Sequence, residues 1–468
     1  MRETPDDFYA DDDEDDMVFE PERRTPVVEN CDVCVVGGSC TGVFAAIRAA
    51  RLGARVVLIE NNGFFGGVAT AGLVNVWHSF HDTLGEKQII AGLSAEIADT
   101  LVARGAAVRH DPRNESVGIR FNSAELILAL DEAVDAHDGI VPMLHSRAVG
   151  VTRESSRDTI TTVIVENPAG RRAVRAKMFI DATGNGDLAR LAGLGLLVYH
   201  KRLPPTTCAI YSGLRSAMAR DPAFTPERVI MDPQNPQALK GFLWYSAIPG
   251  VPDLDMVAGT RVNDVNACED GQLTYAEMEG RRQVRRSLEL LNAHPAGKDV
   301  RLVALPAHIG VRETRHATCL HQVTEKELLE GAAFRDTIGH GSYRVDIHFD
   351  DRPGLVFRYL DGRETISNPP LPDICGRWRE ERAVNPTFYN IPFRSLLPRG
   401  LDNLIVAGRA IDADPGAFGA LRVMVNLNQT GEAAGVAAAL AIETRTAPAA
   451  LDTRLLRETL RKGGSAIM

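Results

Sequence analysis

Residues 31–60 combine a glycine-rich turn with an acidic residue downstream at a fixed spacing. An apolar run, Val33–Val36, precedes the turn and is typical of a buried parallel strand. The turn reads Gly37-Gly38-Ser39-Cys40-Thr41-Gly42, and glycines there let a diphosphate approach backbone N–H groups at a helix start. Glu60 follows after about 20 residues, where a carboxylate accepts hydrogen bonds from an adenosine ribose and disfavours a 2′-phosphate. These residues predict a dinucleotide-binding site.

Three elements must position this site, and the sequence predicts each of them. A helix over residues 42–52 is rich in alanine, which permits close packing on a sheet, and Gly53 suits its C-terminal cap. A second parallel strand is predicted over residues 56–59, directly before the acidic residue. Ser39 replaces the second glycine of the usual G-x-G-x-x-G pattern, but it is small and its hydroxyl can donate to phosphate. The order strand, turn, helix, strand and acid favours a Rossmann-like βαβ unit over a plain parallel-sheet crossover.

The composition is that of an ordinary folded protein with one strongly charged terminal segment. The 468 residues exceed the usual size of one domain. Residues 1–22 contain eleven acids and one arginine, which accounts for the whole net charge of −10. The rest of the chain is neutral and offers no electrostatic footprint for nucleic acid, and no stretch approaches the ~18 apolar residues that a membrane span needs. The seven cysteines are scattered and odd in number, as in a reducing cytoplasm, where we expect the protein.

Residues 1–30 are predicted to form a disordered acidic tail. The tail contains a few apolar residues, Phe8-Tyr9 and Met17-Val18-Phe19. A free tail is the interpretation that the composition favours. Docking of these residues on a neighbouring subunit of a homo-oligomer is the alternative.

Further elements follow from hydrophobic periodicity and capping residues. Helices are predicted over 86–104, from Asn122 or Ser123 onward, and over 274–291 with Thr274 and Glu277 as a capping box. Strand-like segments cover 140–152, 161–166 and 172–180, and the last leads into Asp181-Ala182-Thr183-Gly184-Asn185-Gly186-Asp187. A final helix of small residues begins near Ala420.

Four blocks make the chain resemble the bacterial FAD-dependent oxidoreductases built on the glutathione-reductase-like fold. The blocks are 35–60, 66–73, 181–187, and 403–409 with 421–424; segments 310–315 and 345–348 look like the same family. The resemblance covers residues 31–445. It implies an α/β fold with a Rossmann-like FAD-binding domain, formed by 31–199 and 386–445, and an inserted α+β substrate domain over 200–385. Residues 446–468 remain as a C-terminal helix or tail.

The resemblance implies that FAD is the cofactor and lies extended, with its diphosphate on the glycine-rich turn and its ribose on Glu60. The 66–70 loop would cover its middle, Val149 would offer backbone to the adenine, and segments 408–409 and 421–423 would reach the flavin. The implied cofactor-binding residues are Gly37, Gly38, Ser39, Cys40, Thr41, Gly42, Glu60, Asn61, Gly66, Gly67, Thr70, Val149, Ala182, Thr183, Gly184, Asp187, Gly408, Arg409, Leu421, Arg422 and Val423. We expect the binding to be non-covalent, and no metal site is predicted.

Oxidation of a substrate by flavin requires a base that removes a proton while hydride passes to N5. His348 is the preferred candidate, because Asp346 and Arg344 share its strand face and a carboxylate there can orient the imidazole. His78 and His81 follow the loop that would cover the flavin and are the reserve candidates. Tyr389 is a further candidate.

Arginines near the C-terminal half are candidates for binding an anionic group of the substrate. Arg312, Arg315 and Arg394 can each hold a carboxylate or phosphate in a bidentate manner. A structural ion pair between Arg312 and Glu313 is the alternative for the first of them.

Three classes of function remain open at this point. Oxidation of a small polar metabolite, anionic if the arginines bind it, is favoured because one nucleotide fingerprint is present and none is seen for NAD(P)H. A flavin monooxygenase or halogenase supplied by a separate reductase is the alternative, although Trp244-Tyr245 and Ile248-Pro249 do not reproduce the Trp-x-Trp-x-Ile-Pro signature of flavin halogenases. The third class is a flavoprotein with a non-redox role. No motif identifies the electron acceptor.

Overall fold

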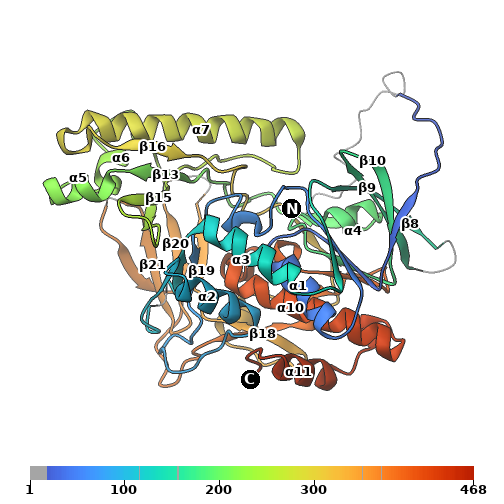
Figure 1. Cartoon of the computed structure of the whole chain (residues 1–468). Coiled ribbons are helices and arrows are strands. Elements are labelled where there is room, and N and C mark those ends of the chain that lie inside the picture. Colours follow the sequence, from blue (N-terminus) through green and yellow to red (C-terminus); the bar gives the residue numbers. More distant parts are fainter. Residues whose placement is uncertain (1–17, 115, 155–157, 350–351, 370) are drawn as a thin grey trace.

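The computed structural model describes residues 18–114, 116–154, 158–349, 352–369 and 371–468 (Figure 1). Most of the acidic tail, including Phe8, Tyr9 and Met17, lies outside these residues. Within them, no helix is long and apolar enough to cross a membrane.

A five-stranded parallel sheet contains the predicted βαβ unit. Its strands are β2 (Val33–Val36), β3 (Val56–Ile59), β7 (Ile140–Met143), β11 (Met178–Asp181) and β24 (Leu404–Val406). They lie in the order β24-β11-β2-β3-β7, and all four neighbouring pairs are parallel. α1 (Cys40–Arg51) connects β2 to β3, and Gly53 follows its end in the left-handed region at φ +87°. The predicted α/β fold class with a Rossmann-like unit is therefore confirmed.

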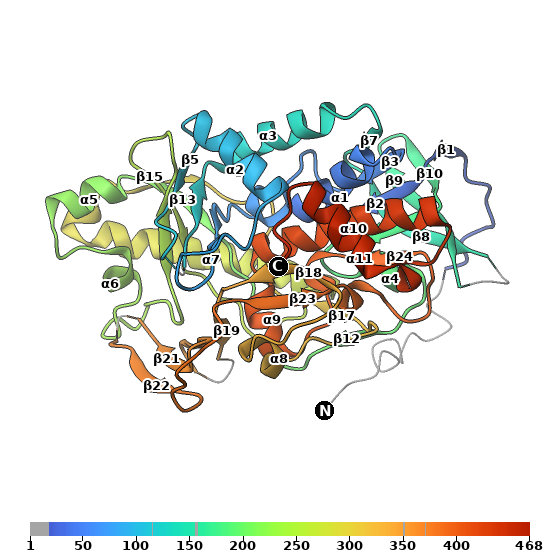
Figure 2. The ribbon, with the colours of Figure 1, turned by 90° about the horizontal axis from the view of Figure 1, so that it is seen from below.

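Residues near the C-terminus complete this sheet and cover it. β24 pairs with β11 although the whole segment 182–403 lies between them in the chain. Figure 2 shows α10 (Met424–Thr444) beside α1. Added Cβ atoms at Gly431 and Gly435 would meet the backbone oxygens of Thr41 and Ala45 in α1, so the two helices pack backbone to backbone. The predicted final helix is split in two, since α9 (Pro415–Leu421) ends before α10 begins.

A second, four-stranded sheet differs from the sequence prediction in two places. Its strands are β1 (Val27–Asn30), β8 (Arg147–Arg153), β9 (Ile160–Asn167) and β10 (Gly170–Arg175), in the order β1-β10-β9-β8. β1 was expected to belong to the acidic tail, but its backbone pairs with β10. The segment 172–180 was expected to be one strand, yet β10 and β11 belong to different sheets.

The start of α2 shows how tertiary contacts override local periodicity. The helix spans Leu93–Ala103 rather than 86–104, and Gly92 before it has φ +66°. The Glu432 carboxylate of α10 accepts a hydrogen bond from the N–H of Leu93 at 3.2 Å, so a residue distant in sequence caps this helix. α3 (Ser123–Asp135) begins as expected, with the Asn122 side chain accepting from the N–H of Ala124. β4 (Val76–Trp77), β6 (Ile119–Phe121) and β5 (Ala107–Arg109) form a small sheet nearby.

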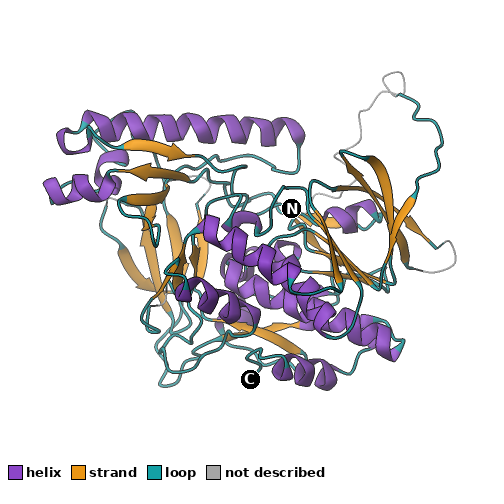
Figure 3. Cartoon of the chain, viewed as in Figure 1, coloured by secondary structure: helices purple, strands orange, loops and turns teal. Residues whose placement is uncertain are grey.

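The segment between the two parts of the parallel sheet has its own antiparallel sheets. One consists of β13 (Ala209–Ser212), β14 (Trp244–Ala247), β15 (Leu254–Ala258) and β16 (Arg301–Ala304). The other consists of β19 (Val345–His348), β20 (Leu355–Arg358), β21 (Arg363–Ser367) and β22 (Ile374–Arg377). Figure 3 shows the long helix α7 (Asp270–Ala293) along the outer side of the first sheet. The short helices of this segment are α5 (Leu214–Arg220), α6 (Pro226–Ile230) and α8 (Glu325–Leu329).

The predicted capping box at Thr274 is wrong, because α7 begins at Asp270. The Glu277 carboxylate instead accepts from the N–H of Ile309 at 2.7 Å and pairs with Arg281. The Glu277 side chain, which the spacing placed at a helix start, therefore binds the backbone of the segment that follows β16.

Two strand pairs cross the predicted domain boundaries at residues 199 and 385. β12 (Leu196–Val198) pairs with β17 (Arg315–Ala317), and β18 (Thr337–Gly341) pairs with β23 (Tyr389–Pro392). The expected inserted segment is thus joined to the expected FAD-binding part by backbone hydrogen bonds.

Two further helices complete the chain. α4 (Asp187–Leu191) follows β11, and α11 (Thr453–Lys462) lies in the predicted C-terminal segment.

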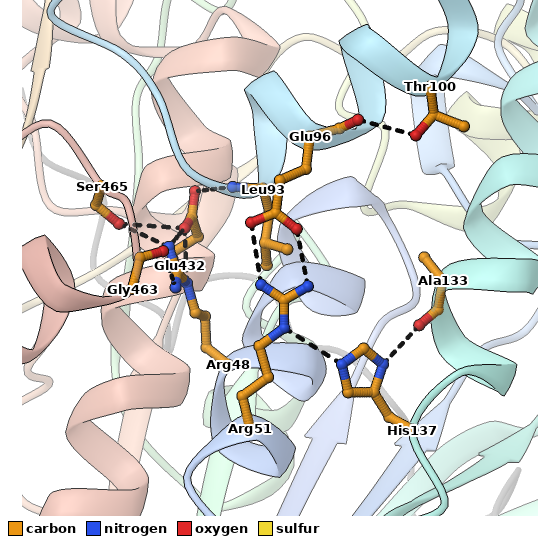
Figure 4. Close-up of polar contacts among 10 residues, drawn as sticks. All are labelled: Arg48, Arg51, Leu93, Glu96, Thr100, Ala133, His137, Glu432, Gly463 and Ser465. Atoms are coloured by element: carbon orange, nitrogen blue, oxygen red, sulfur yellow. Dashed lines mark hydrogen bonds and ion pairs between the residues drawn. The ribbon is translucent and has the colours of Figure 1, made fainter. Parts of the chain in front are cut away.

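A buried ion pair joins α1 to α10 and to the C-terminal segment (Figure 4). Arg48 and Glu432 have side chains only 4% and 1% exposed, and Arg48 Nε donates to Glu432 Oε2 at 2.7 Å. Arg48 also donates to the backbone oxygen of Gly463 and to Ser465 Oγ. The hydrogen-bonding partners come from α2, α10 and the C-terminal segment, so the pair ties these parts of the chain to α1.

Glu432→Ala is expected to lower the free energy of unfolding by about 3–5 kcal/mol, because it leaves a buried guanidinium without its counter-charge. Urea denaturation followed by circular dichroism measures the loss. The matched control is Glu96→Ala, which removes the half-exposed partner of Arg51 in the same region (Figure 4) and should cost no more than about 1 kcal/mol. Equal losses of unfolding free energy in the two variants would contradict the larger contribution expected of the buried Arg48–Glu432 pair.

Candidate active site

The glycine-rich turn forms a narrow cradle at the carboxyl end of β2. Gly37 has φ +103°, and an added Cβ there would collide with the backbone of Ala182 and Thr183. A Cβ on Gly42 would collide with the Gly37 carbonyl. Glycine is therefore required at both positions, and the backbone is open to a ligand that approaches closely.

The start of α1 supplies backbone donors to this cradle. Its N-cap Ser39 is extended, and no described side chain caps the first turn. The N–H of Gly66 donates to the Gly38 carbonyl at 2.8 Å, which lays the 66–70 loop against the turn. Thr70 closes this loop by donating to the Phe65 carbonyl at 2.7 Å. An uncapped helix start beside a glycine turn suits a diphosphate.

Glu60 lies next to the same turn. Its Oε2 accepts from the N–H of Gly38 at 2.6 Å, and its Oε1 accepts from the N–H of Asn62 at 2.7 Å. The residue is 7% exposed. Oε1 also accepts from Asn62 Nδ2 at 2.8 Å. The carboxylate thus holds the loop together, and Oε2, with one hydrogen bond, keeps lone-pair capacity for a ribose hydroxyl. Of the remaining predicted residues on this side, Asn61 is exposed and Val149 lies at a register shift of β8.

The turn after β11 faces the cradle from the other side. Burial raises the pKa of Asp181 to about 6, although Thr183 and the N–H of Ala189 donate to it. Gly184 lies at φ +76° against the Arg409 guanidinium, which donates to Asn185 Oδ1 at 3.2 Å. Arg409 Nη1 is buried and has no hydrogen-bond partner, and the N–H of Gly408 donates to Thr430 Oγ1 at 2.9 Å. A cationic group with a free donor at this point fits an anionic cofactor.

These features fit FAD in the extended arrangement that the resemblance implies. Gly37, Gly38, Thr41 and Gly42 would hold its diphosphate, Glu60 its ribose, and the Gly408–Arg409 turn the part that leads to the flavin. Burial raises the pKa of the Cys40 thiol to about 12, which keeps it protonated and unsuited to a covalent tether.

A cavity of about 320 Å³ opens where the flavin end of the cofactor would lie. This volume is near the lower limit of ligand sites, about 300–1,000 Å³. The cofactor side is lined by Val68, Arg409, Arg422, Val423 and Met424. The polar residues of the cavity include His78, Arg261, Arg312, Tyr343, Arg344, Asp346 and His348. Its apolar wall includes Val74, Val117, Phe242, Trp244, Leu355 and Phe357.

Asp346 connects the polar residues of the cavity. Arg422 donates to its Oδ2 at 2.9 Å, and the Tyr343 hydroxyl donates to the same oxygen at 3.0 Å. His348 Nε2 lies 3.6 Å from its Oδ1, an electrostatic contact rather than a hydrogen bond. Burial by itself would raise the pKa of Asp346, but Arg422 and its other neighbours hold that pKa well below its usual range. The residue is therefore a buried anion.

Both histidines of the cavity are neutral in the free protein. Burial lowers the pKa of His348 well below its usual value; Asp346 opposes this effect, while Arg261, Arg312 and Arg422 strengthen it. Burial also lowers the pKa of His78 to about 3. His78 lies edge-on to Tyr343, with ring centroids 4.2 Å apart, and its Nδ1 has no hydrogen-bond partner. Each ring can accept a proton.

Arg394, Tyr389 and His81, which the sequence offered as candidates, do not line the cavity. Arg394 pairs with Asp336 at 3.0 Å, and its side chain is 48% exposed. Tyr389 is buried and donates to the Ala420 carbonyl while accepting from Asn426 Nδ2. His81 lies outside the cavity, and its carbonyl accepts from Ser79 and Ser342.

The arginines of segment 310–315 separate in the structure. Arg312 lines the cavity, whereas Arg315 pairs with Asp187 at 3.3 Å. The alternative ion pair between Arg312 and Glu313 is not formed, because Glu313 accepts from the N–H of Leu203 and pairs with His316. The described hydrogen-bond acceptors of Arg312 are instead neutral oxygens, the Pro204 carbonyl and Thr206 Oγ1.

Arg261 is a cavity residue that sequence reasoning missed. It follows β15 in a segment without periodicity or a motif, so no local signal distinguishes it from a surface arginine. The sequence places Arg422 near the cofactor, and the structure shows that it also donates a hydrogen bond to Asp346 in the cavity.

The fold and the site together define an FAD-binding flavoenzyme. The model of the family described as FAD dependent oxidoreductase matches residues 32–460. The chain belongs to this family and is an oxidoreductase that uses FAD.

Individual relatives are distant. Mitochondrial dihydrolipoyl dehydrogenase of Schizosaccharomyces pombe is 24% identical over 169 residues, which is 33% of this chain and 28% of that enzyme. Among solved structures, a geranylgeranyl bacteriochlorophyll reductase-like protein from Thermoplasma acidophilum has 15% identity and a TM-score of 0.43, over 93% of this chain and 83% of that one. The p-nitrophenol 4-monooxygenase PnpA from Pseudomonas putida DLL-E4 has 13% identity and a TM-score of 0.44, over 92% and 84%.

Glu60→Ala is expected to weaken FAD binding by about 10- to 100-fold, because the ribose loses a charge-assisted acceptor worth about 1.5–3 kcal/mol. Titration of the apoprotein with FAD, followed by quenching of flavin fluorescence, measures the affinity. Asn62→Ala is the control: it removes a loop contact of the same carboxylate and leaves the carboxylate in place. Unchanged FAD affinity in Glu60→Ala would place the adenosine elsewhere.

Proposed function

We propose that the protein oxidises a small anionic metabolite, with hydride transfer from the substrate to bound FAD. The observation that carries this proposal is the composition of one cavity. It joins residues expected at the flavin, Arg409, Arg422 and Val423, to a neutral histidine, His348, and to Arg312, a guanidinium with no carboxylate partner among the described residues. A proton acceptor and an anion-binding group therefore lie beside the expected position of the flavin.

Bound FAD would supply the hydride acceptor, and the chain's own residues would manage the proton and the substrate's charge. His348 is the proposed base, since it is neutral in the free protein and the Asp346 carboxylate lies 3.6 Å away to stabilise the imidazolium that forms. Arg312 would hold an anionic group of the substrate and orient the carbon that is oxidised. The apolar wall that includes Trp244 and Phe357 would exclude water from the reacting atoms.

Substrate binding would also change the pKa of the proposed base, His348. The guanidinium groups of Arg261, Arg312 and Arg422 lower the pKa of His348 in the free protein. An anion bound among them offsets their charge, so the pKa of His348 would rise toward neutrality in the complex. The base would then have a greater affinity for the proton when the substrate is in place.

Anaerobic incubation with small carboxylic and hydroxy acids, without NAD(P)H, tests the class of reaction. We expect one of these substrates to bleach the oxidised flavin absorbance within a single turnover. A flavoprotein monooxygenase or halogenase supplied by a separate reductase would instead keep its colour until a reductase and NAD(P)H are added. The second outcome would contradict the proposal.

His348→Ala is expected to slow the limiting rate of flavin reduction by about 10²–10⁴, the usual loss of a general base. Stopped-flow absorbance at the flavin band measures the rate, and FAD content should be unchanged. His137→Ala, at a surface site remote from the cavity, is the control. Loss of the rate in His78→Ala and not in His348→Ala would assign the base to the other cavity histidine.

The pH dependence gives an independent check on the same base. Because the free-protein pKa of His348 lies below its usual value, the second-order rate constant should stay flat near neutrality and fall only under acidic conditions. The limiting rate in the complex should begin to fall at a higher pH, since substrate charge raises the pKa. Identical profiles for the two constants would contradict tuning by the substrate.

A further inference from the structure

Arg261 is buried at the cavity with unused hydrogen-bonding capacity. The residue is 8% exposed, and its backbone is fixed by Gln283 of α7, which exchanges hydrogen bonds of 2.9 Å with the N–H and carbonyl of Arg261. Its Nη1 donates to Thr206 Oγ1 at 2.9 Å and to the Thr260 carbonyl at 2.6 Å. Its Nε is buried and has no partner. The guanidinium is thus held in place, and its Nε–H group remains free to donate a hydrogen bond to a ligand.

Arg312 converges on the same hydroxyl. Its Nη1 donates to Thr206 Oγ1 at 2.6 Å and to the Pro204 carbonyl. Two guanidinium groups therefore meet at one threonine, where all their described hydrogen-bond acceptors are neutral oxygens. Two positive charges that share one hydrogen-bond acceptor repel each other, and burial makes the repulsion stronger.

The described residues of the cavity do not supply the missing negative charge. Asp346 is the one carboxylate among the described lining residues, and it is engaged by Arg422. Among the described residues, no carboxylate forms an ion pair with either Arg261 or Arg312. Burial lowers the pKa of Arg261 to about 10 and also lowers that of Arg312, and the charge of Arg261 lowers the pKa of Arg312 further. Buried charges without partners are costly, which indicates that a ligand provides the compensation.

The other two arginines of the cavity have different environments. Arg344 lies over the Phe357 ring at 3.9 Å and donates to Ser116 Oγ at 2.8 Å. Arg409 lies against the turn at Gly184, on the cofactor side. Arg261 and Arg312 differ from these two in sharing one hydrogen-bond acceptor, Thr206 Oγ1, and together they carry two positive charges.

We infer that the substrate of this cavity is a dianion, and that Arg261 together with Arg312 distinguishes it from a monoanion. This inference rests on the proposed function and names the substrate class more narrowly. Two carboxylates on a short carbon chain, or one phosphate monoester, share the required charge. The apolar wall, with Phe242, Trp244 and Leu355, would contact the uncharged part of the molecule.

The test is a binding titration of the oxidised holoenzyme at pH 8, read as a perturbation of the flavin visible spectrum and as a thermal shift. The probes are succinate and glutarate against their half-amides, and methyl phosphate against dimethyl phosphate. Each pair differs in charge with little change in shape. We expect at least one dianion to bind about tenfold or more tightly than its monoanionic partner. The pair that shows the difference identifies which of the two sources of charge the cavity accepts.

Variants then assign the discrimination to the two arginines. Arg261→Gln and Arg312→Gln should each reduce the preference for the dianion to about twofold or less, while FAD content stays unchanged. Arg261→Lys should retain part of the preference, because it keeps the charge. Arg382→Gln, which breaks an exposed pair with Glu330, should leave the preference intact.

Three outcomes overturn the inference, and they separate it from the proposed function. Equal binding of dianions and monoanions would refute the dianion while leaving oxidation of an anionic substrate in place. Absence of binding by every anion would refute both. Loss of FAD in Arg261→Gln, with no change in anion preference, would show that the cofactor compensates these charges.

Discussion

The close contact between α1 and α10 is the constraint on which the site depends. Gly431 and Gly435 allow the backbone of α10 to lie against the backbone of α1 at Thr41 and Ala45, where any side chain would collide. The buried Arg48–Glu432 pair fixes the same contact from one side. Because α1 begins at the nucleotide turn and α10 begins near Arg422, this contact determines how far the flavin-end residues lie from the diphosphate cradle. An extended cofactor that reached from the glycine-rich turn to Arg422 would require the distance between them to be constant.

The charge balance of the cavity follows from which residues share it. Asp346 neutralises Arg422 and faces His348, so one carboxylate serves both a guanidinium and the proposed base. Arg261 and Arg312 have no such partner among the described residues. Burial lowers the pKa of His348, and their charges lower it further, so in the proposed mechanism an anion that offset these charges would raise the basicity of this histidine. The low polarity of the surrounding wall strengthens each of these interactions.

Residues 200–385, where we expected the substrate domain, supply most of the cavity lining, and backbone pairing joins them to the rest of the chain. β12 pairs with β17, and β18 pairs with β23, across the boundaries expected at residues 199 and 385. α9 also packs against β19, where an added Cβ on Gly419 would approach the backbone of Asp346 at 2.9 Å. Such contacts leave the polar network of β19 in a fixed position relative to α10. The two parts of the chain therefore form one site although the sequence separates them.

The sequence by itself determined the glycine-rich turn, Glu60 and the parallel strands around them, because these rest on residues close together in the chain and on the short periodicity of strands and helices. It indicated the FAD dependent oxidoreductase family as well, through blocks spread over residues 35–424. It also indicated Arg312 and His348. It placed Arg394 and Tyr389 in the site, but the structure pairs Arg394 with Asp336 and packs Tyr389 in the core. It missed Arg261, which carries no local signal. Only the tertiary structure decided these positions, since burial, pKa and the balance of charge arise from side chains brought together from distant segments.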